Sequence, residues 1–272
     1  MTPLERFDIP PTAPAWQPLP QSKAARAMSI RFLDCGDMAF TVEFGTTIDP
    51  AINERVMALH DAIKAERAQG RLVGVVETVP TVRSLMVVYD PLIARRAVLQ
   101  PAVEALFRLG RTSQAQRRRV VLPCCYDDPE FCLDLAEVAE RTKLDVERVI
   151  ALHLASVFRV CMLGFMPGLP YMAGLEPALY LPRRTNPRVR VPQSSVAIAM
   201  EMTVIYPFDS PGGWHVLGRT PVLMFDKRRP QPATLQSGDE VRFERIDRAT
   251  FDRIEAEVAA GRFDPGTLAK AS

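Results

Sequence analysis

The chain has 272 residues, of which 47% are hydrophobic and 24% charged, the composition of an ordinary globular protein with a substantial core. A formal net charge of +2 is too small to indicate a surface that binds nucleic acid. No apolar run reaches membrane-spanning length and the first residues lack a signal-peptide pattern, so we expect a cytoplasmic protein. The five cysteines have no paired CxxC spacing and the three histidines lie far apart, which argues against a disulfide framework and a metal site.

Residues 1–28 are rich in proline, glutamine, alanine and serine and show no periodicity. This composition predicts a poorly ordered leader, or an arm that lies on a partner. Trp16 is its one candidate anchor, because tryptophan favours partly buried positions.

Residues 29–122 predict a first domain that mixes strands and helices. Strand patterns at 30–33 and 38–44 precede a helical pattern at 50–70, which Asp49 caps and Pro50 begins. Two β-branched strands at 72–79 and 82–89, a second helical pattern that ends near Gly110, and a last strand at 120–122 follow. With the two strand patterns before the first helix counted together, we interpret this order as the βαββαβ arrangement of a ferredoxin-like domain.

Residues 123–272 predict a second, mostly β domain in an overall α+β protein. Helical patterns at 133–141 and 146–155 precede a stretch, residues 161–221, in which frequent glycines and prolines nearly exclude helix. Alternating residues predict one strand at 196–206, and further strands at 222–225 and 240–245 come before a final helix at 249–260. Short strands joined by stiff loops are typical of a barrel or a sandwich.

Two groups of side chains in this domain are candidates for chemistry. His153 lies in a helical pattern between leucines, where it is either a satisfied core residue or an acid/base group. Arginines at 183, 184, 188 and 190 lie in a proline-bounded loop, which is either a solvated basic edge or a site that binds a carboxylate or phosphate. The loop around Gly212 and Gly213 either cradles an anion or is a tight turn. No GxSxG, P-loop or dinucleotide motif occurs.

Many separated motifs resemble one protein family: the KipI-like proteins, also called allophanate hydrolase subunit 1, carboxyltransferase subdomain C/D or the B-type subunit of 5-oxoprolinase. The resemblance runs from about residue 29 to 246. Its pieces include Gly36-Asp37, Val42-Glu43-Phe44-Gly45, Val79-Pro80, Asp134-Leu135, His153, Gly164-Phe165-x-Pro167-Gly168-x-x-Tyr171, Pro182-Arg183, Pro187-Arg188, Ser195-Val196-Ala197-Ile198-Ala199, Ile205-Tyr206-Pro207, Ser210-Pro211-Gly212-Gly213-Trp214 and Gly218-Arg219-Thr220-Pro221.

The resemblance implies a ferredoxin-like domain followed by a cyclophilin-like β-barrel, and a homologous partner that is KipA-like, the C-type subunit of 5-oxoprolinase. In one branch a LamB/YcsF-like protein, the A-type subunit, joins this pair for the ATP-dependent opening of 5-oxoproline to glutamate. In another, the pair is fused to a biotin-dependent urea carboxylase and passes a carboxyl group to urea. A third member inhibits a sporulation kinase.

We therefore predict the B-type subunit of an ATP-dependent amidohydrolase or lactamase, inactive without its C-type partner. A regulatory kinase inhibitor and half of a biotin-dependent carboxyltransferase site remain alternatives. His153 would act as acid/base or orienting group, and Arg183 and Arg188 would hold a carboxylate or acyl-phosphate. The predicted pocket for the small amide or lactam is lined by Ser195, Thr203, Tyr206, Gly212, Gly213 and Arg219.

The chain departs from the family pattern VPAGSVAIAGxQTGIYP at one strand region. It has Gln193-Ser194 in place of Ala-Gly, Met200 in place of Gly, Met202 in place of Gln and Val204 in place of Gly. Those glycines allow a ligand to approach the backbone, and the glutamine offers an amide. We therefore expect a substrate that differs from the usual one.

Overall fold

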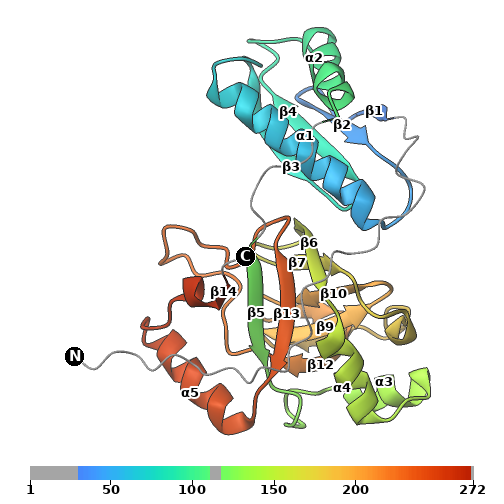
Figure 1. Cartoon of the computed structure of the whole chain (residues 1–272), viewed down its shortest axis with the longest axis vertical. Coiled ribbons are helices and arrows are strands. Elements are labelled where there is room, and N and C mark those ends of the chain that lie inside the picture. Colours follow the sequence, from blue (N-terminus) through green and yellow to red (C-terminus); the bar gives the residue numbers. More distant parts are fainter. Residues whose placement is uncertain (1–29, 111–117, 271–272) are drawn as a thin grey trace.

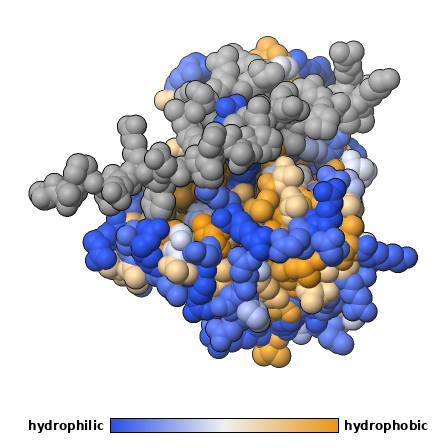
Figure 2. All heavy atoms as spheres, turned by 60° about the horizontal axis from the view of Figure 1, so that its bottom comes forward, coloured by the Kyte–Doolittle hydropathy of each residue, from blue (hydrophilic) through white to orange (hydrophobic). Residues whose placement is uncertain are grey.

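A computed structural model describes residues 30–110 and 118–270, which form the two units that Figure 1 shows one above the other. The small unit, residues 30–110, contains a four-stranded sheet, and the barrel unit, residues 118–270, contains an eight-stranded sheet. The leader and Trp16 lie outside the described residues. Figure 2, which brings the barrel unit forward, shows hydrophobic patches between hydrophilic side chains.

The small unit packs two helices on one face of its sheet. Its elements are β1 (Arg31–Asp34), β2 (Ala39–Glu43), α1 (Pro50–Ala68), β3 (Val75–Pro80), β4 (Ser84–Tyr89) and α2 (Arg96–Arg108). As predicted, Asp49 caps α1, because its carboxylate accepts a hydrogen bond of 2.8 Å from the backbone N–H of Ala51. Both helices place apolar side chains on the same sheet residues, a core that includes Phe40, Val42, Val56, Ile63, Leu85, Val87, Leu99 and Val103.

The strand predicted at 120–122 forms, but the prediction that it belongs to the sheet of the first domain was wrong. It belongs to β5 (Arg119–Cys124), which pairs in parallel with β13 (Glu240–Arg245) of the barrel unit. In the small unit, β1 lies beside β2 and the sheet order is β1-β2-β4-β3, so the described elements follow ββαββα instead of βαββαβ. A short β-branched run fits either sheet, since the choice depends on residues far away in sequence.

The barrel unit forms a nearly closed sheet of seven strands with an eighth at its edge. The order is β12-β9-β10-β7-β6-β13-β5-β14, and a bridge between Cys125 and Arg219 links the β5 end to β12. Besides β5 and β13 its elements are α3 (Leu135–Thr142), α4 (Val146–Ala155), β6 (Phe158–Leu163), β7 (Pro170–Ala173), β8 (Arg188–Val191), β9 (Ser195–Ala199), β10 (Met202–Ile205), β11 (Ser210–Gly212), β12 (His215–Arg219), α5 (Arg248–Ala259) and β14 (Ala269–Lys270).

The single strand predicted at 196–206 is a hairpin of two strands. β9 and β10 pair with each other, and Met200 turns the chain with a left-handed φ of 53°. All five residues of β9 are buried, so both faces of the strand pack against other residues. An alternation of buried and exposed positions therefore cannot mark where this strand ends. The strand predicted at 222–225 makes only an isolated bridge, between Phe225 and Ala233.

The helices of the barrel unit follow their sequence signals. Asp145 caps α4 through the N–H of Arg148 at 2.7 Å, and Asp247 caps α5 through the N–H of Thr250 at 2.8 Å. Within the described ranges, no helix combines the length and hydrophobicity that crossing a membrane requires.

Polar side chains on α1 join the two units. The buried Asn53 donates from its amide to the carbonyl of Cys161 at 3.1 Å and to that of Thr81 at 3.0 Å. The neighbouring Glu54 accepts from Arg159, whose side chain is 2% exposed, at 3.2 Å. Because these partners lie on both sides of the junction, they fix α1 against β6.

Candidate functional site

A buried carboxylate holds two of the predicted arginines. Asp134, just before α3, has a side chain that is 1% exposed. It accepts a hydrogen bond from Arg184 and forms an ion pair with Arg188 at 2.8 Å, while the backbone N–H of Val216 donates to its other oxygen at 2.8 Å. The carboxylate therefore ties the proline-bounded loop to β12, and Arg188 already has an anionic partner within the chain.

Neighbouring groups extend this network along α3. Glu137 accepts from Arg184 and Arg141. Burial raises the pKa of Glu137, but the hydrogen bonds and charges of these arginines outweigh burial and leave it below its usual value. The buried His215 lies with Nε2 3.0 Å from the carbonyl oxygen of Pro182, so this nitrogen donates a proton to it. The loop is thus held from both ends.

Arg183 is placed differently from the other arginines of the loop. It is exposed, and no acidic side chain within the described ranges forms an ion pair with it. The loop bends there because the N–H of Arg184 donates to the carbonyl of Gly213 at 2.8 Å. A Cβ at Gly213 would stand 3.7 Å from two guanidinium nitrogens of Arg183, so the cation lies directly beside this backbone.

Two tyrosines lie within electrostatic reach of this cation. The charge of Arg183 acts on Tyr171 and Tyr206, and both tyrosines pack with Trp214 in one apolar cluster. Burial raises the pKa of Tyr206 to about 12 and outweighs the opposing charge of Arg183. The Tyr206 hydroxyl is therefore protonated at neutral pH and available as a donor. We call Arg183, Tyr171, Tyr206, Gly213 and Trp214 the Arg183 cluster.

Position 212, beside the cluster, has no room for a side chain. A Cβ at this position would lie 2.2 Å from the hydroxyl oxygen of Tyr206 and 2.8 Å from its ring carbon Cζ. Of the predicted glycine pair, Gly212 is therefore the one that admits the phenol, whereas a Cβ at Gly213 would only be in ordinary van der Waals contact with the guanidinium. A cation and a neutral hydroxyl thus lie close to the same stretch of backbone, a combination suited to a carboxylate or an amide carbonyl.

The side chains of the other predicted lining residues are placed elsewhere, although the backbone carbonyl of Ser195 accepts from the N–H of Tyr206 at 3.0 Å. Ser195 and Thr203 are 2% and 0% exposed within β9 and β10. Arg219 donates to the carbonyl of Gln193 at 3.0 Å, pairs with Glu255, and lies 5.2 Å from the ring centroid of Phe131. It thus fastens β12 to neighbouring elements.

His153 lies in the core of the barrel unit, and it shares no contact with the arginines. Its ring is 0% exposed, its Nδ1 is 2.8 Å from the hydroxyl of Tyr126, and it packs against Phe158 and Phe243. Burial lowers its pKa to about 3, so the imidazole is neutral. The cluster that the sequence predicted from His153, Arg183 and Arg188 is therefore not formed by direct contact.

The comparisons with known proteins agree with this architecture. Residues 30–235 match the family model described as "Carboxyltransferase domain, subdomain C and D". The chain belongs to this family. It is similar to the B-type subunit of 5-oxoprolinase from Bacillus subtilis, with 33% identity over 243 residues that cover 85% of this chain and 99% of the relative. It is also 39% identical to the corresponding 5-oxoprolinase subunit from Haemophilus influenzae, over 62% of this chain and 78% of the relative.

Solved structures extend the comparison. The crystal structure of TTHA0988 superposes with a TM-score of 0.67 at 38% identity; the match covers 77% of this chain and 40% of that chain. The Kluyveromyces lactis urea carboxylase gives a TM-score of 0.70 at 22% identity, over 90% of this chain and 24% of that chain, which shows the shared fold. A urea amidolyase of Lachancea kluyveri is 26% identical over 89% of this chain and 15% of its own length.

Sequence reasoning missed three residues that organise the site. Tyr171 and Trp214 stand in motifs that carried the family resemblance, but no role was predicted for either. Asp134, which holds the loop, also stands in such a motif, yet it lies 50 residues from Arg184 in sequence. That motif was its only signal, because nothing local in sequence links Asp134 to the arginines.

Proposed function

We propose that this protein is the B-type subunit of a multi-subunit, ATP-dependent hydrolase that opens 5-oxoproline or a related small lactam, and that it works in the cytoplasm with a C-type partner and a LamB/YcsF-like A-type partner. Support comes from the relatives named as this subunit of 5-oxoprolinase, one of which is matched over nearly its whole length. The description of the barrel unit as cyclophilin-like is part of the same proposal.

The observation that carries the assignment of the site is the charge of Arg183, which has no acidic partner among the described residues. Arg184 and Arg188 are bound to Asp134, and Arg190 is bound to Asp209 at 2.5 Å. Arg183 is thus the arginine of this loop whose fork is available to an incoming carboxylate. The protonated Tyr206 hydroxyl beside it would donate to the lactam carbonyl.

Exposed apolar residues next to the cluster support a partner subunit. Val189, in the strand β8 that pairs with β11, is 88% exposed. Phe165, in the loop before Tyr171, is 75% exposed and has a left-handed φ of 69°. Both the exposed phenyl ring and the strained backbone cost free energy in the lone chain. A C-type partner that covers this rim would recover it and enclose the Arg183 cluster.

ATP would supply the phosphoryl transfer that activates the amide for hydrolysis. We place its binding in the assembled complex because this chain has no P-loop. Arg183 is the residue here that would contact a phosphoryl oxygen or the substrate carboxylate, and no further step is assigned to it. His153, enclosed in the core, would support the fold of the site and take no direct part.

Replacing Arg183 with Gln tests the proposal in the reconstituted complex of B-, C- and A-type subunits. We expect 5-oxoproline-stimulated ATP hydrolysis to fall about 100-fold, because a charge-assisted pair contributes a few kcal/mol in a water-excluded site. Arg190→Gln is the matched control, since Arg190 lies in the same loop with a side chain that is 75% exposed. Its activity should stay near that of the parent.

Three results separate the proposal from its alternatives. Equal activity of the Arg183→Gln and Arg190→Gln complexes would remove Arg183 from the site. Carboxyl transfer from carboxybiotin to urea, without lactam-dependent ATP hydrolysis, would favour the carboxyltransferase alternative that the similarity to urea amidolyase supports. Inhibition of a histidine kinase by the lone chain would favour the regulatory alternative.

A further inference from the structure

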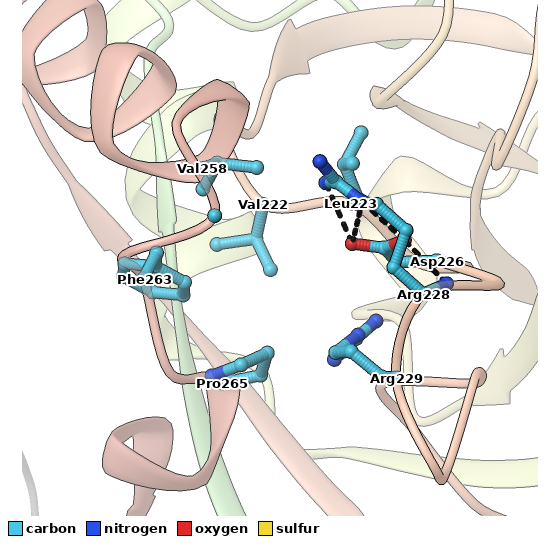
Figure 3. A pocket seen from close by; sticks show the side chains of 9 residues that line it. Val222, Leu223, Asp226, Arg228, Arg229, Val258, Phe263 and Pro265 are labelled. Atoms are coloured by element: carbon cyan, nitrogen blue, oxygen red, sulfur yellow. Dashed lines mark hydrogen bonds and ion pairs between the residues drawn. The ribbon is translucent and has the colours of Figure 1, made fainter.

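A cavity of about 300 Å³ opens between two segments of the barrel unit that are remote in sequence. One wall is the loop after β12, and the other is the chain that leaves α5 (Figure 3). Gly261 has a left-handed φ of 70°, which turns the chain back after α5 and places Phe263 and Pro265 opposite the loop. The volume is at the lower end of the range for sites that bind small molecules.

The lining of this cavity is apolar on one side and cationic on the other. Val222, Val258, Phe263 and Pro265 supply aliphatic and aromatic surface, and the side chain of Arg229 lies across from them in Figure 3. None of these residues belongs to the Arg183 cluster. A ligand that fits must therefore combine an apolar body with one polar end.

The charged groups at the polar end are not equally available. The guanidinium of Arg228 donates to both carboxylate oxygens of Asp226, at 2.9 and 2.8 Å, so these two charges compensate each other. Asp264 lies near Arg229, but its carboxylate accepts from the backbone N–H of Gly266 at 2.8 Å. Of the two cations that line the cavity, Arg228 and Arg229, only Arg229 has hydrogen-bond partners that are all neutral among the described residues.

Arg229 retains an unused donor. One terminal nitrogen donates to the carbonyl of Pro232 at 3.0 Å and to the hydroxyl of Thr234 at 2.8 Å, both neutral acceptors. Its Nε is buried and has no hydrogen-bond partner in the part of the chain that the structure describes. Burial lowers the pKa of Arg229 and outweighs the opposing charge of Asp226. A partly buried cation with an unpaired N–H is costly unless an anion completes it.

We propose that this cavity binds a small organic monoanion, a carboxylate carried on a branched aliphatic body, with the carboxylate on Arg229 and the body against Val222, Val258 and Phe263. A single carboxylate beside the guanidinium compensates its charge. The aliphatic body replaces water at the apolar wall. A dianion such as phosphate satisfies only the first of these two requirements.

Isothermal titration of the full chain with 4-methylpentanoate tests the proposal, and 4-methylpentanamide serves as a neutral ligand of the same shape. We expect saturable binding of the carboxylate in the millimolar range or tighter, and binding of the amide at least about tenfold weaker. Arg229→Gln should weaken carboxylate binding by at least about tenfold while it leaves the volume of the cavity nearly unchanged. Arg262→Gln is the matched control, because Arg262 is exposed, adjoins Phe263 and does not line the cavity.

A second variant tests the shape of the cavity without a change in charge. Val258→Phe fills the cavity from α5 without touching Arg229, and it should abolish binding while thermal unfolding stays cooperative. Three results would overturn the proposal: no saturable binding of the carboxylate, equal affinity for acid and amide, or unchanged affinity in both Arg229→Gln and Val258→Phe. Each is independent of lactam hydrolysis, so failure here leaves the proposed function standing.

Discussion

Replacing Asp134 with Asn tests whether this buried carboxylate holds the loop that carries Arg183. The substitution keeps the shape of the side chain but removes the charge that binds Arg184 and Arg188. Loss of one partner from a buried ion pair costs about 3–5 kcal/mol. The two arginine side chains are 20% and 25% exposed, so water solvates part of the released charge. We therefore expect the free energy of unfolding to fall by about 2–3 kcal/mol.

Urea unfolding followed by circular dichroism measures this loss, with Asp209→Asn as the matched control. Asp209 also binds an arginine of the loop, Arg190, but the two side chains are 43% and 75% exposed. An exposed pair of this kind contributes up to about 1 kcal/mol. If both variants lower the free energy of unfolding by the same small amount, Asp134 does not hold the loop and our interpretation of the network fails.

Two further predictions concern Gly212 and His153. Gly212→Ala should lower the activity of the assembled complex about tenfold or more, because the added Cβ displaces the Tyr206 ring; unchanged turnover would contradict the role of this contact. For His153, burial lowers the folded-state pKa from 6.5 to about 3. The unfolded chain therefore binds a proton that the folded chain excludes, and stability is lost as pH falls from 6.5 towards 3. His153→Phe should flatten this decline in urea unfolding across that range, and equal slopes would argue against the neutral, buried histidine.

The helices could be predicted from sequence because their signals are local. Asp49, Asp145 and Asp247 each lie next to the turn they cap, and apolar spacing marks the buried face. Strand pairing is not local. The run at Val120 fits two sheets equally well by composition, and its partner Val241 lies near the other end of the barrel unit's sequence.

The site could be predicted only in part, for the same reason. The proline-bounded arginines and the glycine pair were visible as a concentration of special residues. Which arginine is free depends on the positions of acids elsewhere. Asp134 pairs with Arg184 and Arg188, and Glu137 also pairs with Arg184, whereas no acid forms an ion pair with Arg183 within the described ranges. His153 carried a motif, yet burial decides its role, and burial is not encoded by its neighbours alone.

The departures from the family pattern can now be assigned to separate places. Met200 stands 53% exposed at the turn between β9 and β10, and Met202 is buried with Cys161 near the small unit. Val204 alone packs in the apolar cluster that contains Tyr171 and Tyr206. A valine there adds volume beneath the two tyrosines, where the family pattern has a glycine. Met202 also packs against Tyr171 and Trp214 of the Arg183 cluster. Any change in substrate shape should therefore act through positions 202 and 204, whereas Met200 stands at the exposed turn.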